Sequence, residues 1–362
     1  MTTSKTATRG WVKMLFTALI LPFIFSFCSQ AYAEDVVPQD HTRVAIKSEF
    51  LGEARTINIR LPAGYETSGE KTYPVLYVLN EDSNFEWASY IVELQASRFG
   101  IEDMLVVGIP HAGNYSRDNY PFAGQNSVQL NPQAQNHSAF IREEVVPFVE
   151  QNFRVHGGRA IIGHSLSGLF VAHMFVEHSD AFSTFIAISP SFHHAPQMSS
   201  IMRTFLLEVP DDAGQIYMAL GSLEHEEAQQ GYRDVIEAIQ SVAPQIVDEN
   251  LTYMPNTDHL LGAFQGTYSA LAWMYKDYTI QSEIAQNLTF DEYISHYEEL
   301  SERLGYTVKP RKRHLTGYAQ FMIKRVGDSQ AGITALRVAQ HYYPDAQDVR
   351  DLIQELLPDI QN

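Results

Sequence analysis

Apolar positions along the chain fall into short, uninterrupted runs that alternate with longer segments of helical periodicity. The apolar runs span 73–79, 104–109, 159–162, 182–189, 215–220 and 249–254. Runs of this kind suit parallel strands that are covered on both faces. The helical periodicity predicts helices over 85–99, 138–153 (with a bend near Pro147), 169–176, 197–209, 226–242 and 261–278. The alternation predicts an α/β fold with an open, mostly parallel sheet and helices on both faces.

The two ends of the chain depart from this alternation. Segments 42–50 and 55–61 alternate with period two and predict an antiparallel hairpin at the edge of the sheet. After about residue 280 the strand pattern stops, and helices are predicted over 290–304, 315–326, 331–342 and 345–357. We therefore expect an α/β domain over 34–280 and a small helical appendage over 281–362.

A long polar segment interrupts the alternation at residues 110–135. It is rich in Gly, Asn and Pro, and it has no regular apolar period. Loops of this length within a compact domain are usually functional or disordered. We expect this segment to form part of the wall of a substrate pocket.

Residues 1–33 have the pattern of a secretory signal peptide. Three basic residues precede the apolar run 14–27, and Ala31-Tyr32-Ala33 fits a cleavage site before Glu34. Cleavage after Ala33 predicts a periplasmic or secreted protein that is not inserted in a membrane. The one cysteine, Cys28, lies in this leader, so the mature chain forms no disulfide.

The chain is strongly acidic, with 25 basic against 43 acidic residues and a formal net charge of −18. Such a surface repels nucleic acid and anionic lipid, so neither is an expected partner. The same charge also serves solubility.

The 14 histidines raise the alternative of a metal site. No H-E-x-x-H spacing occurs, and the adjacent pair His193-His194 would point in divergent directions. The sequence also has no dinucleotide fingerprint and no P-loop. Neither a metal nor another cofactor is expected.

The chemistry centres on the hexapeptide Gly163-His164-Ser165-Leu166-Ser167-Gly168, which joins the run 159–162 to the helix 169–176. A serine at a sharp turn from strand to helix is the nucleophile elbow of α/β-hydrolases, G-x-S-x-G. The last glycine of that pattern is replaced by Ser167, with Gly168 directly after it. A hydroxymethyl group adds little bulk, so we interpret the departure as tolerated.

A serine hydroxyl is a poor nucleophile at neutral pH and needs a histidine base, which a carboxylate orients. In α/β-hydrolases the order along the chain is serine, acid and histidine, each at the carboxyl end of a strand. Glu224 lies just beyond the strand 215–220, and His259 lies in the predicted loop after 249–254. The sequence predicts Ser165 as the nucleophile, His259 as the base and Glu224 as the acid.

Other histidines were weighed as the base. His193 and His194 follow a strand end but precede every acid candidate, so we expect them to line the pocket. His164 sits beside the nucleophile, where its side chain is expected to point away and pack. His225 as the base would leave the loop after the last strand without a role.

Among the acids, Glu226 and Asp248 remain alternatives to Glu224. Asp258 is less suited, because a neighbour of His259 cannot easily reach the far nitrogen of that ring. The oxyanion of the tetrahedral intermediate needs two N–H donors. We expect these from the backbone of Leu166, directly after the nucleophile, and from Asp82 or Glu81 in the turn after 73–79.

Several segments together resemble the esterase D, or putative-esterase, family of α/β-hydrolases. They are Pro74–Asn80 (PVLYVLN), Val106–Pro110 (VVGIP), Phe140–Val149 (FIREEVVPFV), GHSLSGLF, Ile188–Phe192 (ISPSF), LGSLE and the Asp258-His259 pair. The resemblance covers about residues 42–278. Within the family, the chain is most similar to the branch of enterochelin-type siderophore esterases. The resemblance implies a small-molecule ester substrate and the triad Ser165–Glu224–His259. Asn80-Glu81 departs from the Asp-Gly often found in the oxyanion loop.

The tail from 315–319 to 342–346 resembles a tetratricopeptide segment of at most one and a half repeats, too few for an independent solenoid. We expect it to pack on the α/β domain or to cap its pocket, and a protein partner of this tail is possible.

The hypothesis is thus an exported serine esterase. The alternatives are an acyltransferase of the cell envelope with the same triad, or a non-catalytic binding protein that acts through its helical tail.

Overall fold

The structure is a computed structural model, which describes residues 41–79, 81–98, 100–111, 115–210, 213–244, 251–280 and 288–356. The predicted signal peptide lies outside these residues. Across the described ranges, no helix is both long enough and apolar enough to cross a membrane.

Among the described residues, eight strands form one sheet in the order β1-β2-β4-β3-β5-β6-β7-β8. The strands are β1 (His41–Lys47), β2 (Ala54–Arg60), β3 (Tyr73–Leu79), β4 (Leu105–Ile109), β5 (Val155–His164), β6 (Thr184–Ile188), β7 (Gln215–Gly221) and β8 (Leu251–Met254). β1 and β2 form an antiparallel hairpin at one edge, and β2 pairs antiparallel with β4. The remaining pairs are parallel. The predicted fold class and the edge hairpin are confirmed.

The described helices alternate with the strands along the chain up to β8, and further helices follow it. They are α1 (Glu81–Arg98), α2 (Tyr115–Asn119), α3 (Pro132–Ala139), α4 (Val146–Asn152), α5 (Leu166–Glu177), α6 (Met198–Leu207), α7 (Glu226–Gln240), α9 (His259–Met274), α11 (Phe290–Leu304), α12 (Lys312–Phe321), α13 (Ser329–Tyr342) and α14 (Gln347–Leu356). Short 3-10 turns cover Tyr65–Thr67 and Phe192–His194, and π-helical segments cover Phe140–Val145 and Met322–Val326.

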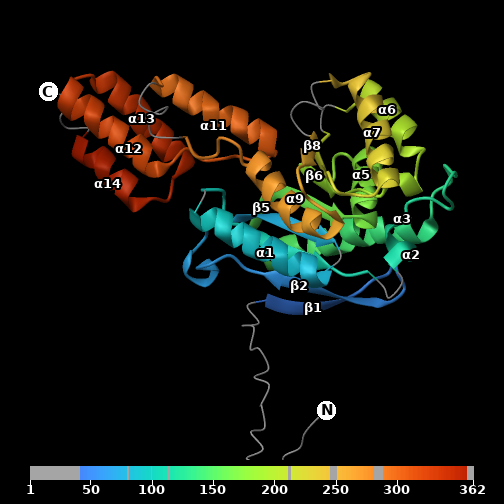
Figure 1. Cartoon of the computed structure of the whole chain (residues 1–362). Coiled ribbons are helices and arrows are strands. Elements are labelled where there is room, and N and C mark those ends of the chain that lie inside the picture. Colours follow the sequence, from blue (N-terminus) through green and yellow to red (C-terminus); the bar gives the residue numbers. More distant parts are fainter. Residues whose placement is uncertain are drawn as a thin grey trace, which may run out of the picture. The chain divides into compact units, whose positions relative to one another are not determined.

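The sheet separates two apolar clusters because successive side chains of a strand point to opposite faces. On one face, Val75 and Tyr77 of β3 share a cluster with residues of α5, α6 and α7. On the other face, Leu76 and Val78 share a cluster with residues of α1, α9 and α11. α1 and α9 lie side by side on this second face (Figure 1). The continuous apolar runs in the sequence therefore mark strands buried on both faces.

Several of the described helices begin earlier than the apolar period predicts, α1 and α3 by the most residues. α1 starts at Glu81, although a turn was expected after β3 and the helix only from residue 85. α3 starts at Pro132 within the segment predicted to be a long loop, and the side chain of Asn131 accepts a hydrogen bond from the N–H of Gln133. The expectation of a loop without helices over 110–135 is thus wrong, because a cap and a proline start a helix there.

The helix predicted over 138–153 is interrupted where the bend was expected. α3 runs into the π-helical segment Phe140–Val145, and α4 follows with Pro147 in its first turn. Proline has no N–H to donate to the carbonyl four residues earlier. The π-helical segment before Pro147 accommodates the absence of this hydrogen bond.

The helical segment after residue 288 packs on the second face of the sheet. Leu300 and Leu304 of α11 lie in the same buried cluster as Leu76 of β3. The hydroxyl of Tyr306, just after α11, donates to Glu102 Oε2 at 2.8 Å. The described part of this segment therefore shares a core with the α/β sheet. The boundary at residue 280 and the tetratricopeptide-like character of the tail stay predictions.

Replacement of Leu304 tests this shared core. The side chain is fully buried, so Leu304→Ala should lower the free energy of unfolding by about 3 kcal/mol. The variant should still unfold in one transition, measured by urea titration with circular dichroism. Leu207→Ala is the matched control, because Leu207 is 57% exposed and its loss should change stability by less than about 0.5 kcal/mol. A separate early transition in Leu304→Ala would contradict a shared core.

Candidate active site

Ser165 occupies a strained turn between β5 and α5. Its backbone has φ 63° and ψ −120°, a conformation that non-glycine residues rarely adopt. The glycines on either side leave room for this turn. A Cβ on Gly163 would lie 2.2 Å from the carbonyl oxygen of Ser167, and one on Gly168 would lie 2.7 Å from that of Ile188. The strand, the helix and the neighbouring strand therefore approach as closely as the predicted elbow requires.

Ser167, which replaces a glycine of the usual pattern, is fully buried and well bonded. Its hydroxyl donates to the carbonyl oxygen of His164 at 2.9 Å, and it accepts from the N–H of His164 at 3.2 Å. A buried hydroxyl with both roles satisfied costs little. This explains how the turn accommodates a serine at that position.

The structure brings the three predicted side chains together. Ser165 Oγ lies 3.0 Å from His259 Nε2. On the other side of the ring, His259 Nδ1 lies 2.8 Å from Glu224 Oε2 and 3.0 Å from Glu224 Oε1. The serine hydroxyl can donate to Nε2 while Nδ1–H donates to the carboxylate. This is the relation that a serine, a base and an orienting acid have in a nucleophilic triad.

Glu224 lies in the loop between β7 and α7, and its side chain is only 1% exposed. Burial alone would raise the pKa of this carboxyl, but His259 and the hydroxyl of Ser189 beside it outweigh burial and lower the pKa below its ordinary value of 4.5. Glu224 is therefore ionised at neutral pH. The close passage of the neighbouring loop is possible because Gly221 has no Cβ, which would lie 2.2 Å from the carbonyl oxygen of Thr257.

His259 is the first residue of α9, not part of a loop, so that detail of the prediction is wrong. Asp258 directly before it caps the helix, and its Oδ1 accepts from the N–H of Leu261 at 2.9 Å. An aspartate before an apolar helical stretch is a start signal that the sequence contained. The cap gives Asp258 a structural role, and the helix places the imidazole over the carboxyl ends of the strands.

The other candidate histidines and acids take different places. His194 lines the pocket beside Ser165, as expected, but His193 is not among the residues that line it. The rings of His193 and His194 lie 4.1 Å apart, and His225 lies 4.8 Å from His193. Glu226 forms an exposed ion pair with Arg233, whereas Asp248 lies outside the described residues.

His164 does not simply point away from the site. Its Nε2 lies 2.8 Å from the backbone carbonyl oxygen of His259. Burial and the neighbouring His259 lower the pKa of His164 to about 4, so this imidazole is neutral at neutral pH.

The two predicted oxyanion donors lie at helix N-termini. Leu166 is the first residue of α5, and Asp82 lies in the first turn of α1, directly beyond the carboxyl end of β3. N–H groups in a first helical turn have no acceptor within their own helix and favour negative charge. The N–H of Ser167, one residue further on, donates instead to the hydroxyl of Tyr115 at 3.0 Å. The roles of Leu166 and Asp82 stay predictions.

An open pocket of about 510 Å³ leads to the serine. Its lining residues are Tyr115, Ser116, Tyr120, Gln125, Ser165, Leu166, Ser191 and His194. Two of them touch the elbow and were not found from the sequence. Ser191 Oγ lies 3.3 Å from Ser165 Oγ, and the hydroxyl of Tyr115 lies 3.1 Å from the carbonyl oxygen of His164. No motif identifies these contacts, because they depend on how α2 and the loop after β6 meet the elbow.

A buried ion pair holds the pocket wall that carries Tyr115. Arg55 of β2 donates to Asp118 Oδ2 of α2 at 2.9 Å, and Asp118 is fully buried. Arg55 also donates to the carbonyl oxygen of Pro110 at 3.0 Å. The polar segment after β4 is thus attached to the sheet at two points. Among the described residues, no group of three or more His, Cys, Asp or Glu side chains could hold a metal ion.

A mostly parallel sheet covered by helices on both faces, with a strained serine at a strand-to-helix turn, defines an α/β-hydrolase. A family model described as "Putative esterase" matches residues 48–230, just over half of the chain. The chain belongs to this esterase family.

Individual relatives agree with this assignment. The ferri-bacillibactin esterase BesA of Bacillus subtilis (strain 168) is 31% identical over 160 residues, which cover 39% of this chain and 55% of BesA. The chain thus spans about half the length of this curated relative. An IroE-like serine hydrolase from Shewanella oneidensis has a similar structure, with a TM-score of 0.67, 22% identity and coverage of 83% of this chain and 99% of the other. The siderophore hydrolase EstA from Aspergillus nidulans gives a TM-score of 0.52 at 16% identity, over 66% of this chain and 95% of the other.

The lowered pKa of Glu224 predicts a pH-dependent difference in stability. A carboxyl whose pKa is lower in the folded than in the unfolded chain stabilises the fold above its unfolded pKa, and this contribution is lost as the pH falls through the folded pKa. The difference in unfolding free energy between the wild type and Glu224→Gln should therefore shrink as the pH falls from about 6 to about 3.5. Urea titrations of both proteins across this range measure it. A difference that stays constant would contradict an ionised, stabilising Glu224.

Proposed function

We propose that this chain is an exported serine hydrolase that cleaves carboxylic esters through an acyl-enzyme. The observation that carries the proposal is the 3.0 Å contact between Ser165 Oγ, held in a strained turn, and His259 Nε2. The Glu224 carboxylate on the far side of the ring completes the arrangement. Membership of the esterase family supports the same reaction.

The proposed reaction has two halves. Ser165 Oγ attacks the ester carbonyl as His259 Nε2 takes its proton, and Glu224 stabilises the imidazolium that forms. The backbone N–H groups of Leu166 and Asp82 hold the oxyanion of the tetrahedral intermediate. His259 then gives the proton to the leaving alcohol, and the acyl group stays on Ser165. In the second half, a water molecule that His259 deprotonates attacks the acyl carbonyl. His259 then returns the proton to Ser165 Oγ, and the free acid leaves.

The pocket walls and the relatives suggest which esters to test first. Tyr115, Tyr120, Gln125 and His194 offer aromatic surface and hydrogen-bonding groups beside Ser165. BesA is named a ferri-bacillibactin esterase and EstA a siderophore hydrolase. We therefore propose small-molecule esters of the siderophore type as substrates. Export to the periplasm or the medium would follow from the signal-peptide pattern of residues 1–33.

Ser165→Ala tests the nucleophile. The wild type should react with a fluorophosphonate probe and hydrolyse a short p-nitrophenyl ester. Ser165→Ala should not be labelled and should lose at least about 10³-fold in kcat, since loss of a triad nucleophile removes most of the rate enhancement. Intact-protein mass spectrometry and a continuous absorbance assay measure the two effects.

A melting curve of Ser165→Ala controls for misfolding. Alanine has the same difficulty with a positive φ as serine, so its midpoint should stay close to that of the wild type. Equal labelling and turnover in the two folded proteins would reject Ser165 as the nucleophile.

A further inference from the structure

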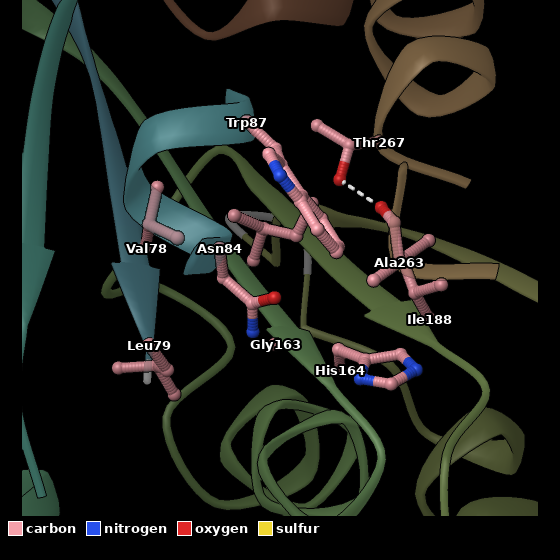
Figure 2. Close-up of a pocket in the computed structure, with 10 residues that line it drawn as sticks. Val78, Leu79, Asn84, Trp87, Gly163, His164, Ile188, Ala263 and Thr267 are labelled. Carbon is pink, nitrogen blue, oxygen red and sulfur yellow. Dashed lines mark hydrogen bonds between the residues drawn. The ribbon is translucent and has the colours of Figure 1, made fainter. Parts of the chain in front are cut away.

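His164, the residue before the nucleophile, contacts the backbone of the proposed base, His259. His164 ends β5, and its ring lines a small cavity on the face of the sheet that α1 and α9 cover. Figure 2 shows the ring below Ala263 and Thr267 of α9 and below Trp87 of α1, with Asn84 of α1 to its left. His164 thus lies under the helix whose first residue is His259.

The contact between the two histidines is specific. A carbonyl oxygen only accepts, so the bond of 2.8 Å to the backbone of His259 requires a proton on His164 Nε2. The ring centroids lie 4.6 Å apart at an angle of 43°. His164 therefore holds the main chain of His259 through a hydrogen bond and also packs against its ring.

The first turn of α9 has few other restraints on its outer side. Leu260 is 73% exposed and Leu261 is 48% exposed. Further along the helix, the packing is close: a Cβ on Gly266 would lie 2.5 Å from Ile188 Cγ2. The body of α9 is thus held against β6. In the first turn, the His259 ring bonds to Glu224 and Ser165, and a Cβ on Gly262 would lie 2.9 Å from Ser189 Oγ. The backbone of this turn is held in addition by the cap from Asp258 and by the bond from His164.

We propose that His164 is a positioning residue that holds the first turn of α9, and thereby His259, in register with Ser165. The proposal rests on the proposed function, since it concerns the distance between nucleophile and base. Residues 164 and 165 are consecutive, so one turn of the backbone aims the nucleophile at the imidazole and a donor at the main chain of the same histidine. The neutral state of His164 suits this role, because a second positive charge at this distance would oppose the imidazolium that forms on His259.

His164→Phe removes the donor and keeps an aromatic ring. We expect fluorophosphonate labelling and kcat for a p-nitrophenyl ester to fall roughly tenfold, because small displacements of a catalytic group are costly, while KM changes less than about twofold. His164→Gln places an amide nitrogen near the position of Nε2 and should restore most of both rates. His164→Asn is shorter, cannot reach the carbonyl oxygen of His259, and should behave like His164→Phe.

His296→Phe is the matched control. His296 Nε2 makes the same kind of bond, 2.8 Å to the carbonyl oxygen of Asp277, beyond the opposite end of α9. This variant should keep the labelling rate, kcat and KM of the wild type.

The outcomes separate the two proposals. A wild type that the probe does not label contradicts the proposed function and this role with it. A labelled wild type with an equally fast His164→Phe overturns the positioning role alone. The positioning role is also overturned if His164→Gln is as slow as His164→Phe while its melting midpoint is unchanged. If His164→Phe does not fold, equal rates for His164→Gln and His164→Asn overturn the role, and a fast Gln with a slow Asn variant supports it.

Discussion

The backbone conformation of Ser165 is the constraint on which the site depends. A non-glycine residue at φ 63° costs on the order of 1–3 kcal/mol, which the surroundings must offset. The N–H of Ser165 donates to Ile188 of β6 at 2.9 Å, and its carbonyl oxygen accepts from the N–H of Ser191 at 3.1 Å. The strained residue is thus held from both sides by the neighbouring strand and the loop that follows it. Because β6 also packs against α9, the same strand sets the positions of the serine and of the helix that carries the histidine.

Much of this arrangement could be predicted from the sequence, since the parallel strands are buried on both faces and appear as continuous apolar runs. The glycines around Ser165 predict the sharp turn. The order of serine, acid and histidine at successive strand ends was enough to select Glu224 and His259, which the structure places in contact. Their catalytic roles remain a proposal that the geometry supports.

The details that sequence reasoning missed have two physical origins. Helix starts were placed too late where the signal was a cap and not an apolar period, as at Asp258 before α9 and at Asn131-Pro132 before α3. Side chains such as Tyr115 of α2 and Ser191, in the loop after β6, reach the elbow only through tertiary contacts. No local pattern encodes such a meeting, because it depends on how the sheet brings distant strand ends together.

The packing of α11 has a consequence for how this architecture can vary. Tyr306 covers Gly158 of β5 so closely that a Cβ there would lie 2.5 Å from its ring. The helix before it buries Leu300 and Leu304 in the core of the sheet. Removal of α11 and the residues after it would expose apolar side chains of the sheet to solvent. In evolution, this helix could therefore not be lost or exchanged as an independent module unless the apolar residues of the strands beneath it were also replaced.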